Sequence, residues 1–242
     1  MLKGLFEYVV GLAKPEIVES NGGTYSDKKL YAIPRKNAVK TTLQMSTLSS
    51  LVDYIKGAEE DFTLSSYLIQ VVSPTEVRLL SQLDEYGDRD VLATVSAELP
   101  DFRFDYYYDS EPFLIGVRSK FQETEDRELV IKFAGSAEKN TLQSYKDDGI
   151  SQKVTVSSGI ASKEEALVPG IVSLKPFSTF TEIEQPEREF VFRMREDSGI
   201  KCALFEADGG AWRHEAMWHI QAYLEEQLED ISLGDKTILV IA

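Results

Sequence analysis

The stretch YLIQVVSPTEVRLLSQLDEYGDRDVLATVSAEL, residues 67–99, decides the fold class. Apolar side chains recur with the period of a half-buried strand along Tyr67–Val72, Glu76–Leu83 and Val91–Leu99. The segment Glu85-Tyr86-Gly87-Asp88, which joins the last two runs, has the length of a hairpin turn. The stretch therefore predicts an antiparallel meander of three strands.

Helical patterns lie on both sides of this meander. An apolar stripe with spacings of three and four follows Ser46-Thr47 and ends at Gly57, which predicts a helix with Ser46 or Thr47 as its cap. The same signals predict further helices at Leu2–Ala13, from Ser110, from Thr124 and at Gly210–Ile231.

The second half of the chain returns to strand patterns. Asp147-Asp148-Gly149 supplies the positive φ angles of a tight hairpin between two of them. The expected strands outside the meander are Lys29–Ile33, Thr41–Met45, Leu142–Lys146, Gln152–Ser157, Ile171–Leu174, Ser178–Ile183, Phe190–Arg195, Ile200–Ala207 and Lys236–Ile241. The predicted fold class is α+β, with antiparallel meander sheets and packed helices.

A long helix beside a meander is expected in each half of the chain. We therefore expect one compact α+β domain over residues 1–242, with two related lobes, 1–137 and 138–242, as the alternative. At the level of the fold alone, a repeated helix-plus-meander unit is similar to DNA sliding clamps.

The composition excludes several classes of protein. The 41 acidic against 26 basic residues give a net charge of −15, which disfavours broad coating of nucleic acid. One cysteine, Cys202, and two histidines build neither an internal disulfide nor a usual zinc site, so we expect a reducing cytoplasm and no metal. No apolar run approaches 18 residues, and we expect no membrane partner.

The charge is distributed unevenly. Residues 27–40 hold five basic side chains and one acid. A local anion or nucleic-acid contact is predicted there, weak and dependent on salt, and the alternative is a solvated basic face. The residues concerned are Lys28, Lys29, Arg35, Lys36 and Lys40.

No catalytic motif stands out. His214 and His219 are five residues apart, so on a helix they point about 140° apart and do not form a zinc-protease pair. Cys202 alternates with apolar neighbours on one strand face and is expected to be buried rather than nucleophilic. The sequence has no nucleophile elbow, Walker loop or dinucleotide fingerprint, so we expect a non-enzymatic protein without catalytic residues or cofactor.

Glu206 and Asp208 lie at a strand end that leads into a helix. With a third carboxylate they would hold a divalent cation. The alternative is that Asp208 caps the helix and that Gly209 and Gly210 allow close packing of strand and helix.

The segment Phe102–Tyr108 is rich in aromatic residues. Phe104, Tyr106, Tyr107 and Tyr108 are predicted to form a protein interface, with ordinary core packing and base stacking as the alternatives. The acids around them would repel phosphates, which disfavours base stacking.

Three strings carry a resemblance to a known family: Asp147–Gln152, Leu174–Phe180 and Ala203–Trp212. With them the chain resembles the uncharacterised YfdQ-like proteins of phages and prophages over about Ser46–Leu228. The resemblance implies expression in the cytoplasm of an infected bacterium and no transferable activity. We therefore expect an oligomeric phage accessory protein that binds a host or phage protein, with a DNA replication or recombination accessory as the alternative.

Overall fold

The chain consists of two compact units, Met1–Lys40 and Thr41–Ala242. This computed structural model describes residues 2–13, 15–20, 23–28, 39, 41–57, 65–84, 86–144, 152–157, 163–231 and 237–242. How residues 1–242 divide into domains stays a prediction.

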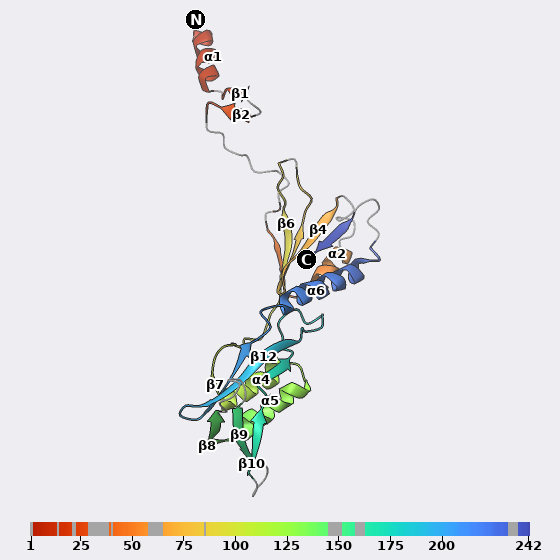
Figure 1. Cartoon of the computed structure of the whole chain (residues 1–242). Helices are drawn as coiled ribbons and strands as arrows, with labels where there is room; N and C mark the ends of the chain where they lie inside the picture. The colour runs from red at the N-terminus through yellow and green to blue at the C-terminus, as the bar shows by residue number, and fades with distance from the viewer. Residues whose placement is uncertain are drawn as a thin grey trace. The chain divides into compact units, whose positions relative to one another are not determined.

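The first unit contains a helix and a hairpin. The predicted helix is confirmed as α1 (Leu2–Ala13), and it is followed by antiparallel strands β1 (Ile17–Ser20) and β2 (Gly23–Ser26) (Figure 1). At the open end of the hairpin, the Glu16 amide donates to the Asp27 carboxylate at 2.7 Å, and the Asp27 amide donates to the Glu16 carbonyl at 3.1 Å. The predicted strand Lys29–Ile33 lies outside the described residues.

The predicted meander is confirmed in the second unit. Strands β4 (Tyr67–Ser73), β5 (Glu76–Leu80) and β6 (Val91–Ser96) pair antiparallel, and their alternating burial packs one face of the sheet on the core. Two edge strands extend the sheet in parallel fashion, β14 (Ile238–Ile241) beside β4 and β3 (Leu43–Met45) beside β6. The order of the five strands is therefore β14-β4-β5-β6-β3.

Two helices cover one face of this sheet (Figure 1). They are α2 (Leu48–Gly57) and α6 (Trp212–Leu228). The Ser50 amide donates to Thr47 Oγ1 at 3.2 Å, so Thr47 caps α2 as predicted. The predicted apolar stripes of both helices reach the core, whose fully buried members include Leu48, Leu51, Ile55, Ile69, Val77, Leu79, Val95, Ile220 and Leu224.

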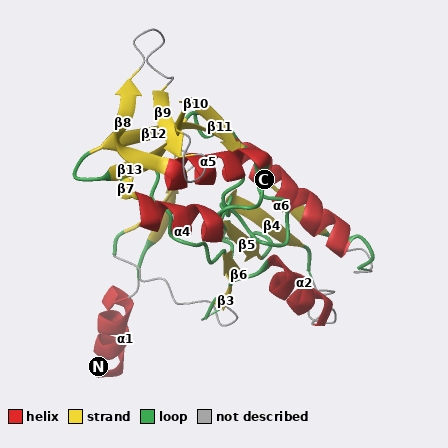
Figure 2. Ribbon diagram, turned by 90° about the horizontal axis from the view of Figure 1, so that it is seen from below, coloured by secondary structure: helices red, strands yellow, loops and turns green. Residues whose placement is uncertain are grey.

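A four-stranded antiparallel sheet holds the second core. Its order is β11 (Ile171–Leu174), β12 (Arg188–Glu196), β13 (Ile200–Glu206) and β7 (Tyr108–Asp109). The neighbouring helices α4 (Ser110–Lys120) and α5 (Glu125–Ser136) pack on this sheet (Figure 2). The core contains Phe113, Val117, Val130, Leu174, Phe190, Phe192 and Leu204.

Three further strands form a separate sheet. They are β8 (Ala137–Ser144), β9 (Gln152–Ser157) and β10 (Lys163–Val168), with β9 in the centre and antiparallel to both neighbours. The predicted pairing of β8 with β9 is confirmed by the register Ser144↔Gln152, whereas the predicted turn Asp147-Asp148-Gly149 lies outside the described residues.

The strand predicted at Ser178–Ile183 is wrong. The segment between β11 and β12 is irregular there, because the buried side chain of Gln185 takes the place of a neighbouring strand. Its Oε1 accepts from the amides of Ser178 (2.9 Å) and Thr179 (3.2 Å), and its Nε2 donates to the Phe180 carbonyl (2.9 Å).

This irregular segment also connects the two cores. Phe180 and Ile183 belong to the core below α2 and α6, although β11 and β12 on either side build the other core. Thr179 Oγ1 donates to the Pro74 carbonyl at 2.5 Å, and both residues are part of the contact between the segment and the meander.

Candidate protein-binding surface

The aromatic segment is held in place by backbone hydrogen bonds. The Asp105 amide donates to the Leu204 carbonyl at 2.9 Å, and the Arg103 amide donates to the Tyr108 hydroxyl at 2.9 Å. Asp105 has a φ angle of 56°, a left-handed conformation that its short polar side chain tolerates. The two hydrogen bonds tie the segment to β13 and to its own Tyr108.

Two of the four predicted interface residues contribute to packing. The rings of Phe104 and Phe190 stack at 5.0 Å, and Tyr108 lies 5.3 Å from Phe102, which itself makes an edge contact with Phe121 at 4.9 Å. Phe104 and Tyr108 therefore extend the second core, which is the alternative that the sequence left open.

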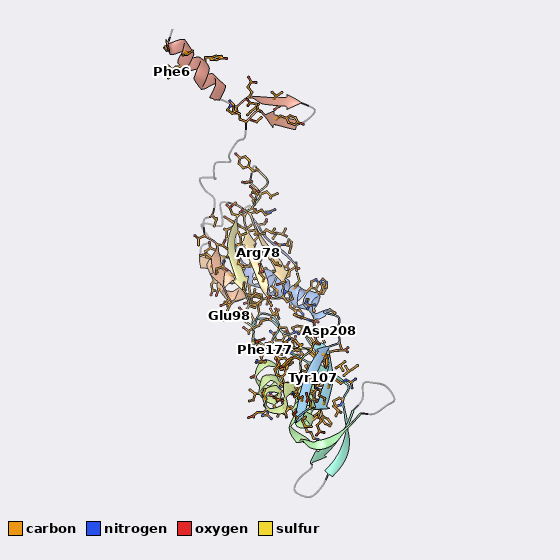
Figure 3. The ribbon with its side chains drawn as sticks, turned by 90° about the vertical axis from the view of Figure 1, so that its left-hand side faces the viewer. Phe6, Arg78, Glu98, Tyr107, Phe177 and Asp208 are labelled. Atoms are coloured by element: carbon orange, nitrogen blue, oxygen red, sulfur yellow. The ribbon has the colours of Figure 1, made fainter. Side chains whose placement is uncertain are left out.

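Tyr106 and Tyr107 instead pair with arginines. The Arg103 guanidinium carbon lies 4.8 Å from the Tyr106 ring centre, and that of Arg195 lies 3.9 Å from the Tyr107 ring centre. Tyr106 is 44% exposed and the side chain of Arg195 is 49% exposed. We call these four residues the Tyr–Arg surface; Figure 3 labels Tyr107 among them.

Nearby groups restrict both tyrosines. The Tyr107 ring meets the edge of Phe205 at 5.7 Å, and the Tyr106 ring meets Tyr108 at 5.0 Å. Arg195 Nη2 lies 3.8 Å from the carboxylate of exposed Asp197. The Tyr–Arg surface therefore presents ordered amphipathic rings and guanidinium groups before a partner arrives.

A buried arginine lies on the inner side of the same sheet. Arg188, at the start of β12, is 2% exposed, and its guanidinium lies 4.5–5.0 Å from the ring centres of Phe104, Phe190 and Trp212. Its Nη1 donates to Ser178 Oγ at 3.2 Å.

The candidate cation ligands Glu206 and Asp208 hold this arginine. Arg188 Nη2 donates to Glu206 Oε1, and Arg188 Nε lies 3.7 Å from Asp208 Oδ2. Burial lowers the pKa of Arg188, and the two carboxylates oppose that shift. In the part of the chain that the structure describes, no three His, Cys, Asp or Glu side chains are grouped to hold a metal ion.

Asp208 does not cap α6 as the sequence indicated. The cap position is Ala211, and Asp208 Oδ1 instead accepts from the Gly210 amide at 2.9 Å (Figure 3 labels Asp208). Gly209 and Gly210 have φ angles of 62° and 82°, so the turn before α6 needs left-handed residues.

The remaining candidate residues do not converge on one site. His214 is exposed, His219 is partly buried, and both flank the buried stripe of α6. Cys202 is fully buried, and burial raises the pKa of its thiol to about 12, so the thiol stays protonated near neutral pH.

The predicted basic contact falls almost wholly outside the described residues. Lys28 is described, and its amide donates to Ser26 Oγ at 3.3 Å. Lys29, Arg35, Lys36 and Lys40 lie outside the described part of the chain.

Sequence reasoning missed the arginines. Alternation along Arg188–Arg195 places Arg188 on the same strand face as Phe190 and Phe192, and this inward position was a usable signal. The stacking of Arg195 on Tyr107 joins two segments far apart in the chain and had no such signal.

None of the described helices is both long and apolar enough to cross a membrane. Comparisons with protein-family models, with curated proteins and with solved structures found no match for this chain.

Proposed function

We propose that this chain is a non-enzymatic accessory protein that acts by binding another protein through its Tyr–Arg surface. The observation that carries the proposal is the stacking of exposed Arg195 on half-buried Tyr107 at 3.9 Å, together with the second pair, exposed Tyr106 and Arg103, in the same segment of the chain as Tyr107. Tyrosine and arginine are enriched at the energetic centres of protein interfaces, and ordered side chains lose less entropy on binding.

The charge around the surface favours a protein over a nucleic acid. Asp105, Asp109 and Asp197 are exposed near the tyrosines, and they would repel phosphates. A protein partner that offers apolar side chains beside uncharged hydrogen-bond acceptors would meet the rings and the guanidinium groups without this repulsion. The partner class proposed is therefore a folded host or phage protein, in the cytoplasm of an infected bacterium as the YfdQ-like resemblance implies.

Affinity capture from cell lysate, with and without nuclease treatment of the lysate, tests this function. The full chain, tagged and purified from phage-infected cells, is expected to retain the same protein partner with and without nuclease treatment, as measured by quantitative mass spectrometry. Loss of the partner after nuclease treatment would contradict the proposal and would favour the DNA-accessory alternative.

We also propose that the chain assembles with copies of itself through α1. Leu5 and Phe6 are exposed on this helix, and apolar stripes of this kind are usually covered by a partner. Deletion of residues 1–14 is expected to lower the mass of the assembly by at least twofold in light scattering. The change Lys3→Ser, at an exposed polar position of the same helix, should leave the mass unchanged. An unchanged mass after the deletion would remove this assembly from the proposal.

A further inference from the structure

Among the described residues, β14 is the last strand of its sheet and no strand pairs with its outer edge. The Tyr67 amide of β4 donates to the Thr237 carbonyl at 3.0 Å, so the backbone groups of Leu239 and Ile241 face β4 and those of Ile238 and Val240 face outward. The dark blue arrow of β14 lies at the side of its sheet in Figure 1.

Apart from its short length of four residues and the hydrogen bond from Gln221, this edge lacks the usual protection against strand pairing. Exposed edges normally carry charged residues, proline or a bulge, whereas residues 237–242 read Thr-Ile-Leu-Val-Ile-Ala. Leu239 is 59% exposed, and Ile241 is also exposed, on the sheet face opposite α6. An apolar edge of this composition is stabilised when another extended segment pairs with it.

A groove follows the edge on the α6 side. It has a volume of about 320 Å³ and runs between the last turns of α6 and β14. Leu228, Ile231 and Ile238 give it an apolar floor, and Glu225 and Glu229 stand on its helical wall. Both glutamates are exposed.

One side chain links this wall to the strand edge. Gln221 Nε2 donates to Glu225 Oε1 at 2.8 Å and to the outward-facing Val240 carbonyl at 3.3 Å. The amide of Gln221 thus holds Glu225 beside the edge, where the carboxylate can meet the side chain of an added strand.

The charge of the groove selects its occupant. A second copy paired antiparallel through β14 would place two sets of Glu225 and Glu229 side by side, which is unfavourable for a chain of net charge −15. Lysine or arginine side chains instead fit both the apolar floor and the acidic wall of the groove. Their methylene stems cover Leu228 and Ile231, and their charged ends reach the glutamates.

We propose that the groove between α6 and β14 binds an extended, basic segment of a partner protein, which adds as a strand to the edge of β14. Every second residue of this segment is Lys or Arg and faces Glu225 and Glu229. The alternate residues are apolar and lie beside Leu239 and Ile241. This site is independent of the Tyr–Arg surface.

Titration with a fluorescein-labelled peptide of sequence Lys-Val-Lys-Val-Lys-Val-Lys tests the proposal. The full chain should bind this peptide in fluorescence anisotropy, and the amide NMR signals of Ile238 and Val240 should shift. A peptide with the same composition in the order Lys-Lys-Lys-Lys-Val-Val-Val should bind at least tenfold more weakly, because it cannot separate its two faces. Absence of binding at millimolar peptide would overturn the proposal.

Paired charge-reversal variants separate the groove from general attraction to an acidic protein. Glu225→Lys/Glu229→Lys should weaken binding of the alternating peptide at least tenfold. Glu226→Lys/Asp230→Lys changes the net charge equally at exposed positions that do not line the groove, and it should weaken binding less than threefold. Equal weakening by both variants would overturn the proposal. Tyr106→Ala/Tyr107→Ala should bind the peptide as the wild type does, which keeps this test separate from that of the proposed function.

Discussion

Replacement of Arg188 with alanine is expected to lower the free energy of unfolding of the chain by about 3–5 kcal/mol, the range for removal of one partner from a buried ion pair. Arg188 is 2% exposed and lies against three aromatic rings. Its removal leaves Glu206 and Asp208 without their cation and leaves a cavity between Phe104, Phe190 and Trp212.

Urea denaturation followed by circular dichroism measures this loss. Arg195→Ala is the matched control, because Arg195 lies on the same strand with a half-exposed side chain, and its change should stay within about 0.5 kcal/mol. The triple variant Arg188→Met/Glu206→Gln/Asp208→Asn should recover part of the stability, since it leaves no buried charge unpaired. Equal unfolding midpoints for wild type and Arg188→Ala would contradict the stabilising role of the buried Arg188 side chain.

The local pattern of residues predicted most elements of the second unit. The meander at residues 67–99 and the helix after Thr47 follow from periodicity and capping, which depend on residues close in sequence. The placement of β14 beside β4 was not predicted, because a parallel pair joins strands distant in the chain and leaves no signal in either one. The irregular segment at Ser178–Ile183 was misread because the partner of its amides is a side chain, Gln185.

The candidate site was predicted only in part. The high content of aromatic residues identified the segment that contains Tyr106 and Tyr107. The same criterion also selected Phe104 and Tyr108, which pack on the core. Which of these four side chains is buried depends on the left-handed conformation of Asp105 and on the contact of this segment with β13. Both features arise only in the folded chain. Glu206 and Asp208 were correctly singled out as a pair. The cation that both carboxylates face is the guanidinium group of Arg188, which comes from the start of β12.

The largest functional effect is expected from Tyr106→Ala/Tyr107→Ala. Loss of a central interface residue costs about 2 kcal/mol or more, which corresponds to a roughly 30-fold weaker complex. The variant also removes the rings on which Arg103 and Arg195 stack, so the guanidinium groups lose their fixed positions. Its circular dichroism spectrum should match that of the wild type, because Tyr106 is exposed and half-buried Tyr107 is not among the residues of the second core.

The most direct test of the binding function compares three tagged baits in phage-infected cells: the wild type, Tyr106→Ala/Tyr107→Ala, and the control Tyr86→Ala. Tyr86 is exposed in the turn of the meander, away from the Tyr–Arg surface. Quantitative mass spectrometry should show the same partner enriched with the wild type and with Tyr86→Ala, and reduced about 30-fold or more with the double variant. Equal enrichment of every partner by all three baits would contradict binding through the Tyr–Arg surface.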